Sequence, residues 1–272
     1  MNDNRTLDSL NLPWINGYAS SDRGKKRSHN EDRYLLQAWS DNSAVLAVVA
    51  DGMGGNQAGE VAAQIAIDTF AELLDQPLPQ DNRDCYDLLL EQFHKADTII
   101  RQRAGESFEQ LGMGTTLAVA VLTPNQYIHL YAGDCRLYQF RRGEAIYMSA
   151  DHSIVRILQD LGKITPEQVA NHPMRSKVSS CLGGRGGTGQ FSIDPKWDDE
   201  NPPIYSLEPG DIILICSDGL HGLVSNEMLS SILSEVGEIS NELLDRLMES
   251  ALAAGGDDNI TIVATQIPPS KH

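Results

Sequence analysis

The sequence lacks the features that mark several protein classes. Its four cysteines are widely spaced and form no Cys-x-x-Cys pair, which argues against a zinc ribbon or a thioredoxin-type redox site. No apolar run approaches the roughly 20 residues that a membrane helix needs, and the polar stretch Met1–Leu12 has no signal-peptide core. We therefore expect a cytoplasmic protein without a membrane partner, in which Cys135 and Cys216 act as small buried apolar residues.

Positive charge is also scarce. The 272 residues include 21 lysines and arginines against 38 acidic residues, which gives a formal net charge of -17. Non-specific nucleic-acid binding needs a basic surface, so we expect no nucleic-acid partner. The chain shows no internal repeat or low-complexity linker, and its hydrophobic content of 41% is enough for a core. We expect a monomer with a loose leader over residues 1–13, one domain over residues 14–267 and a tail over residues 268–272.

The hydrophobic periodicity predicts an α+β fold. Apolar residues spaced as on one helix face predict helices at Val61–Leu74 and Asp84–Arg103. A second pair of helices is expected near Asn226–Val236 and Ser240–Ala254, ahead of a closing strand at Ile260–Ile267. Strands separated by turn residues are expected at residues 115–123, 127–131, 136–140, 145–148 and 211–216. Strands joined by hairpins, with helices in pairs, predict antiparallel sheets covered by helix pairs.

Two apolar runs end in the same way. Ala44–Ala50 is followed by Asp51-Gly52, and Ile212–Cys216 is followed by Ser217-Asp218-Gly219. A glycine after the aspartate lets the backbone approach a ligand closely, although an ordinary strand-to-helix turn would also explain each motif alone. If these strand ends converge, their carboxylates repel one another, and a divalent cation is the simplest remedy.

A third acidic motif, Asp257-Asp258-Asn259, precedes the strand-like run Ile260–Val263. Taken alone, Asp258 fits a helix cap followed by an Asx turn better than a ligand. Carboxylate and carbonyl oxygens nevertheless suit Mg²⁺ or Mn²⁺ rather than zinc. Two such ions about 3.5–4 Å apart generate a hydroxide and clamp an in-line displacement at phosphorus. The guanidinium of Arg27, four residues before Glu31, could donate two parallel hydrogen bonds to phosphoryl oxygens. The stretch Lys25-Lys26-Arg27 is equally consistent with a solvated basic turn.

Taken together, these motifs resemble those of the metal-dependent serine/threonine phosphatases of the protein phosphatase 2C type, especially the compact bacterial members. The resemblance covers about residues 17–267, and six motifs occur in the family's order and approximate spacing. They are Arg27-Ser28-His29-Asn30-Glu31-Asp32, Asp51-Gly52-Met53-Gly54-Gly55, Gly114-Thr115-Thr116, Gly133-Asp134-Cys135-Arg136, Ser217-Asp218-Gly219 and Gly256-Asp257-Asp258-Asn259.

The resemblance implies a four-layer α-β-β-α sandwich of two antiparallel sheets, with two Mg²⁺ or Mn²⁺ ions held between the sheets at one end. It implies that Asp51 bridges both metals and that the Gly52 carbonyl ligates one of them. By the same resemblance, Asp218 and Asp258 hold the first metal. Glu31 reaches the second metal through water, and Asp32 lies beside it as an acidic partner.

The resemblance also assigns residues around the metals. Arg27 binds the phosphate, Asp134 contributes to a third, weaker metal site, and residues about 151–190 form a mobile flap in which Arg175 touches the protein substrate. The implied activity is hydrolysis of phosphoserine and phosphothreonine by a hydroxide that bridges the two metals, without a covalent intermediate. The implied partners are phosphorylated proteins, including a serine/threonine kinase or its substrates.

One departure from the family pattern concerns the proton donor. Many members carry a histidine where this chain has Met53 or Asn56. A lone histidine is more often structural than catalytic, and those left as candidates are His29, His152, His172 and His221. The alternative function is therefore a metal-binding pseudophosphatase that binds phosphoproteins without turnover. A two-metal phosphodiesterase or nuclease is a weaker alternative, because the net charge of -17 disfavours a polyanionic substrate.

Overall fold

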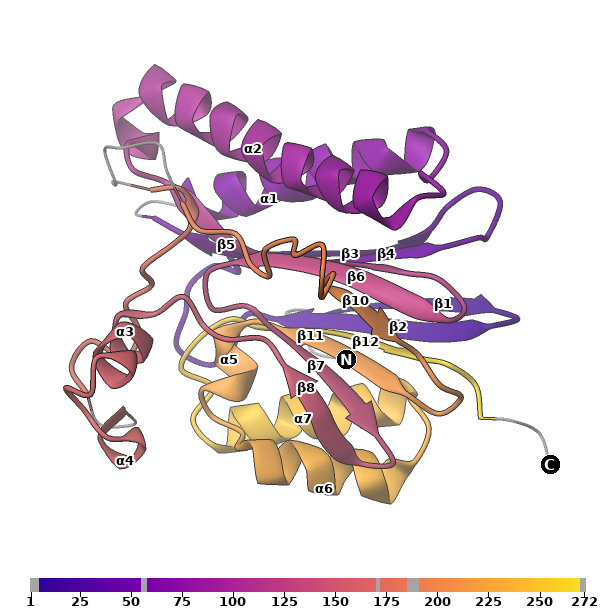
Figure 1. Ribbon diagram of the computed structural model, residues 1–272. Helices are drawn as coiled ribbons and strands as arrows, with labels where there is room; N and C mark the ends of the chain where they lie inside the picture. Colours follow the sequence, from indigo (N-terminus) through magenta and orange to yellow (C-terminus); the bar gives the residue numbers. More distant parts are fainter. Residues whose placement is uncertain (1–4, 55–57, 170–171, 185–190, 270–272) are drawn as a thin grey trace.

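Two antiparallel six-stranded sheets stack face to face in the computed structural model, which describes residues 5–54, 58–169, 172–184 and 191–269 (Figure 1). The first sheet contains, in spatial order, β1 (Arg5–Leu12), β2 (Ile15–Asp22), β12 (Ile260–Gln266), β11 (Ile212–Cys216), β7 (Arg136–Arg141) and β8 (Glu144–Met148). The second contains β10 (Ile204–Ser206), β6 (Gln126–Ala132), β5 (Gly114–Leu122), β4 (Val45–Met53) and β3 (Asp32–Ala38), and β9 (Leu182–Gly183) pairs with the start of β5.

Helices cover the outer face of each sheet (Figure 1). The pair α1 (Ala58–Ala71) and α2 (Asn82–Glu106) lies on the second sheet, and the pair α6 (Asn226–Val236) and α7 (Asn241–Ala253) lies on the first. This arrangement confirms the predicted α-β-β-α sandwich. The remaining helical turns are short: η1 (Glu72–Asp75), η2 (Phe108–Gln110), α3 (Ile154–Asp160), α4 (Pro166–Val169) and α5 (Asp218–His221). Among the described residues, none of the helices combines the length and the apolar character that crossing a membrane requires.

The packing on both sides of β4 explains why this strand is apolar up to Asp51. Alternate side chains of a strand point to opposite faces, so Val45, Ala47 and Val49 pack between the two sheets. Leu46 and Val48, on the other face, pack under α1 and α2. Because both faces of the strand are covered, neither carries a polar residue before Asp51. A third apolar layer lies between the first sheet and the pair α6–α7.

Side-chain caps set the helix boundaries. The Asp81 side chain accepts hydrogen bonds from the backbone N–H groups of Arg83 and Asp84 at 2.8 and 3.3 Å, so α2 begins at Asn82, two residues before the predicted start. It also continues three residues beyond the predicted end at Arg103. Ser225 caps α6 through the N–H of Met228, and this helix has the predicted bounds Asn226–Val236.

The expectation of a loose leader is wrong for residues 5–12. Arg5–Leu12 forms strand β1, which pairs with β2 along its whole length. The stretch appears polar because β1 is an edge strand with most side chains in solvent, whereas Leu10 and Leu12 pack against the core between the sheets. Residues 1–4 lie outside the described part of the chain.

Candidate metal centre

The acidic strand ends meet at one end of the sandwich. Asp32 at the start of β3 pairs directly with Asp51 near the end of β4. In the other sheet, Cys216 at the end of β11 pairs with Ile262 near the start of β12. Asp218, just after β11, and Asp258, just before β12, therefore lie at the same end of this sheet. Burial, followed by repulsion from the carboxylates of Asp32, Asp218, Asp134 and Asp258, raises the pKa of Asp51 well above its usual range. Residues more than 200 positions apart in the chain thus share one acidic cluster.

The other members of the cluster respond in the same way. Burial raises the pKa of Asp32 to about 7, and the negative charges of Asp218 and Asp258 add to the effect. Burial and the charge of Asp218 raise the pKa of Asp134 to about 8. Burial and the charge of Asp258 raise the pKa of Asp218 to about 6. Burial and mutual repulsion thus disfavour the ionised form of these carboxylates, and a bound cation would offset both effects.

The turn after β4 requires glycine. The Gly52 N–H donates to the Glu31 carbonyl at 3.2 Å, and a Cβ at Gly52 would collide with the Gly59 carbonyl and lie 2.6 Å from that of Glu31. A Cβ at Gly59, in the first turn of α1, would lie 2.7 Å from Oε1 of Glu31. The two glycines therefore let the start of α1 pack against the strand end and against Glu31. The sequence reasoning found Gly52 but missed Gly59.

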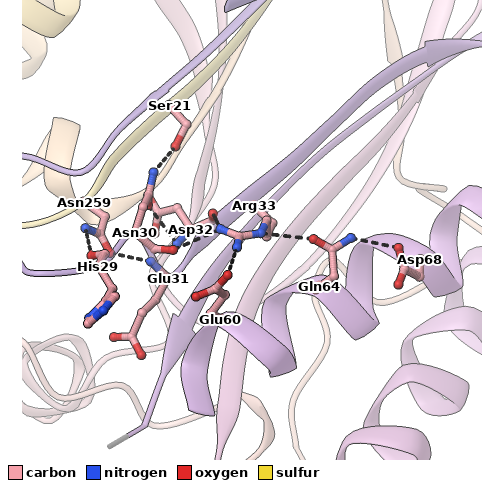
Figure 2. A network of polar contacts seen from close by, with 10 residues as sticks. All are labelled: Ser21, His29, Asn30, Glu31, Asp32, Arg33, Glu60, Gln64, Asp68 and Asn259. Atoms are coloured by element: carbon pink, nitrogen blue, oxygen red, sulfur yellow. Dashed lines mark hydrogen bonds and ion pairs between the residues drawn. The ribbon is translucent and has the colours of Figure 1, made fainter. Parts of the chain in front are cut away.

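Two further polar residues join the sheets at this end. The Ser217 hydroxyl donates to Oδ2 of Asp32 at 2.7 Å and accepts from the Thr261 N–H at 3.0 Å. The Asn259 Oδ1 accepts from the Glu31 N–H at 2.8 Å, and its Nδ2 donates to the His29 carbonyl at 2.9 Å (Figure 2). The sequence reasoning did not assign roles to Ser217 and Asn259, although both flank the acidic motifs. They hold the loop that carries Glu31 and Asp32 against the first sheet.

Arg27 points toward the acidic cluster. Its Nη2 lies 2.7 Å from Oδ2 of Asp258, and its Nη1 lies 3.9 Å from Oε2 of Glu31. The neighbouring Lys26 instead pairs with Asp257 at 2.7 Å, on the outer side of the turn. Arg27 therefore faces the carboxylates of the cluster, whereas Lys26 pairs with a different, exposed carboxylate of the same turn.

Three of the four histidines considered as proton donors form hydrogen bonds to other parts of the chain. His221 is buried, its Nε2 lies 2.9 Å from the Asp134 carbonyl, and burial lowers its pKa to about 4. His152 accepts from the Gly133 N–H through Nδ1 at 3.2 Å and contacts Asp194 through Nε2 at 2.9 Å. His172 accepts from the Met174 N–H at 3.2 Å within the segment 151–190. His29 is exposed and contacts only its neighbour Ser28 through its ring, at 3.0 Å, among the described hydrogen bonds.

The described parts of the segment 151–190, residues 151–169 and 172–184, lie near the acidic end of the sandwich. Its helices α3 and α4 project from that end, and β9 returns to pair with Gly114 and Thr115 of β5 (Figure 1). Arg175 is exposed in this segment, and no side-chain contact of Arg175 with the acidic cluster occurs among the described residues. The structure therefore does not bring Arg175 to the cluster. Asn56 lies outside the described residues.

The donor set fits a hard divalent cation. All candidate ligands are carboxylate or carbonyl oxygens, which Mg²⁺ and Mn²⁺ prefer. Asp32 is 2% exposed, and its Oδ1 has no hydrogen-bond partner among the described residues, so this buried acceptor suits a cation. Within the described parts of the chain, no three Asp, Glu, His or Cys side chains are grouped so that they could already hold a metal ion. The residues thus offer the right chemistry in an open arrangement, in which Asp258 is turned to Arg27.

Comparison with known proteins places this geometry in a family. The family model described as protein phosphatase 2C matches residues 21–254. The serine/threonine protein phosphatase PstP of Mycobacterium tuberculosis is 35% identical over 92% of this chain, although the chain spans only 44% of the length of PstP. A putative protein phosphatase 2C-type protein of Streptococcus pyogenes is 30% identical, over 89% of this chain and 93% of its own length.

A solved structure agrees with the sequence comparison. The catalytic domain of PstP in complex with two manganese ions superimposes with a TM-score of 0.75 at 31% identity, over 97% of this chain and 100% of that one. The likeness therefore extends over both sheets and both helix pairs, and it includes the end where the carboxylates gather. By its sequence and its fold, the chain belongs to the protein phosphatase 2C family.

Proposed function

We propose that this chain hydrolyses phosphoserine and phosphothreonine in proteins with two Mg²⁺ or Mn²⁺ ions. The observation that carries the proposal is the convergence of Asp51, Asp218 and Asp258, from both sheets, beside the guanidinium of Arg27. Membership of the protein phosphatase 2C family and the two manganese ions in the related PstP structure support it. Phosphorylated proteins, including a serine/threonine kinase or its substrates, are the proposed partners.

The proposed ligands divide between the two sheets. Asp51, with the Gly52 carbonyl beside it, would serve both metals, and Asp218 and Asp258 would hold the first. Glu31, next to Asp32, would reach the second metal through water, and Asp134 would serve a third, weaker site. When bound, the ions supply a hydroxide nucleophile at neutral pH and stabilise the charge that develops on the phosphoryl group.

The protein's own groups bind and orient the substrate. Arg27 has a forked guanidinium that matches two phosphoryl oxygens, and its contact with Asp258 aims it at the metal side of the loop. His152 and His221 are held by backbone and carboxylate partners, so we assign neither as the proton donor. A water molecule protonates the departing serine or threonine oxygen in this proposal. General acids contribute about 10²–10⁴-fold, so turnover without a dedicated histidine is expected to be slower.

The test is hydrolysis of a phosphothreonine peptide by the full chain with Mn²⁺, with and without a chelator. We expect turnover that the chelator abolishes, and no turnover by Asp51→Ala or Asp218→Ala. Asp87→Asn is a suitable control because Asp87 forms an exposed ion pair with Arg83 on α2, away from the cluster. Full activity in the Asp51→Ala or Asp218→Ala variant would rule out the mechanism. Mn²⁺ binding without turnover on any phosphopeptide would instead support the pseudophosphatase alternative.

A further inference from the structure

The guanidinium of Arg33 uses all three of its nitrogens in polar contacts beside the acidic cluster (Figure 2). Its Nη1 donates to the carbonyls of Asn30 at 3.0 Å and of Asp32 at 2.7 Å. Its Nε donates to Oε1 of Gln64 at 3.0 Å, and its Nη2 pairs with Glu60. One guanidinium thus joins the backbone on both sides of Glu31 to the first two turns of α1.

The helix that Arg33 contacts also touches the proposed metal ligands. Glu60 follows Gly59, and Oε1 of Glu31 lies so close to Gly59 that a Cβ there would be only 2.7 Å from it. Burial raises the pKa of Glu31, while the charge of Arg27 and the N–H of Gly59 lower it. The Glu31 carboxylate therefore lies between α1 and the loop, and its position depends on how far apart these two elements are held.

The opposite side of the loop is already fixed. Asn30 donates to the Ser21 hydroxyl at 2.8 Å, and Asn259 binds the Glu31 N–H and the His29 carbonyl. These contacts anchor the loop to the first sheet, whereas α1 belongs to the layer over the second sheet. The Arg33 guanidinium reaches the other way, because it donates hydrogen bonds both to the backbone of the loop and to side chains of α1.

We propose that Arg33, paired with Glu60, is a positioning residue that sets the place of Glu31 and thereby the affinity for the second metal ion. The inference rests on the proposed metal centre but assigns a role to residues outside its ligand set. Residues that orient metal ligands typically change metal affinity by about 10- to 100-fold when they are substituted. A surface ion pair without this role would contribute about 0–1 kcal/mol to stability and would leave metal affinity unchanged.

The test is calorimetric titration of Mn²⁺ into the chelator-treated full chain, without substrate. The variants are Arg33→Met, which removes every donor, Arg33→Lys, which keeps the charge without the fork, and Glu60→Gln. Arg246→Met is the matched control, because Arg246 forms an exposed pair with Glu235 at 2.5 Å between α6 and α7, on the opposite side of the sandwich. The melting temperature of each metal-free variant is measured alongside.

We expect Arg33→Met to raise the Kd of one Mn²⁺ site, the second site beside Glu31, about tenfold or more, with the first site unchanged. Arg33→Lys and Glu60→Gln should lie between it and the unmodified chain, and Arg246→Met should leave both sites unchanged. If Arg33→Met does not fold, Glu60→Gln alone must weaken the second site. An unchanged isotherm for the Arg33 and Glu60 variants, or equal weakening of both sites, would overturn this inference alone. An unmodified chain that binds no Mn²⁺ would overturn the proposed function as well.

Discussion

Replacement of Arg27 by methionine removes the guanidinium proposed to hold the phosphoryl group while keeping an unbranched side chain of similar reach. Hydrogen bonds to charged groups contribute about 1.5–3 kcal/mol. A loss of that size in transition-state binding lowers kcat/KM for a phosphothreonine peptide by about 10- to 150-fold. The measurement is steady-state hydrolysis with saturating Mn²⁺, so that any change in metal affinity does not enter the comparison.

The same substitution should leave the fold intact. The Arg27 side chain is 47% exposed where it meets Asp258, and exposed ion pairs contribute about 0–1 kcal/mol to stability. Lys26→Met is the matched control, since Lys26 is the adjacent cation and pairs with Asp257 on the outer side of the turn. We expect the control to change kcat/KM by less than about twofold, because it removes a surface pair of that small size.

Two results would refute this reasoning. Retention of most of kcat/KM by Arg27→Met would show that the phosphoryl group is bound without this guanidinium. An equal loss in Lys26→Met would show that only the net charge of the loop matters, rather than the direction in which Arg27 points.

Three other substitutions test the close packing at Gly52 and the burial of His129 and Phe93. Gly52→Ala should abolish Mn²⁺ binding in calorimetry because its Cβ collides with the Gly59 carbonyl, whereas Gly105→Ala, which meets nothing within 4 Å, should bind normally. Burial lowers the pKa of His129 to about 3, so its neutral form stabilises the fold above its ordinary pKa of about 6.5, and this stability is lost as the pH falls from there toward 3. Between pH 7 and pH 5 the free energy of unfolding should therefore fall by about 2 kcal/mol more in the unmodified chain than in His129→Phe, and equal slopes in urea unfolding would contradict this. Phe93→Ala should lower the free energy of unfolding by about 3–5 kcal/mol in the same assay, because Phe93 is fully buried with its ring centroid 5.3 Å from that of Phe70. A decrease below about 1 kcal/mol would show that the site repacks.

The sequence predicted what depends on local patterns. The unbroken apolar run before Asp51 indicated a strand covered on both faces, and β4 has a helix layer on one side and a sheet on the other. Helical periodicity placed α6 at its observed bounds. Turn motifs and apolar periodicity are local as well, and they located β5–β8, β11, β12 and α7 to within one residue at each end.

Features that depend on contacts across the chain were not predictable in this way. Strand β1 looked like a loose leader because an edge strand needs few apolar residues, and its partner β2 is recognised only through the pairing. The roles of Asn259 and Arg33 depend on partners that the fold brings close, such as the Glu31 N–H and the Glu60 carboxylate. The sequence also does not reveal the partner of a lone histidine, and only the structure shows that His221 contacts the Asp134 carbonyl.

The central claim is that the acidic cluster holds two divalent cations. The most direct measurement is anomalous diffraction from crystals of the full chain grown with Mn²⁺. Our account predicts two anomalous peaks bridged by Asp51, with Asp218 and Asp258 on one of them and Arg27 facing the open side. A structure at the same Mn²⁺ concentration with no peak at Asp51, or with manganese only at surface carboxylates, would contradict the account.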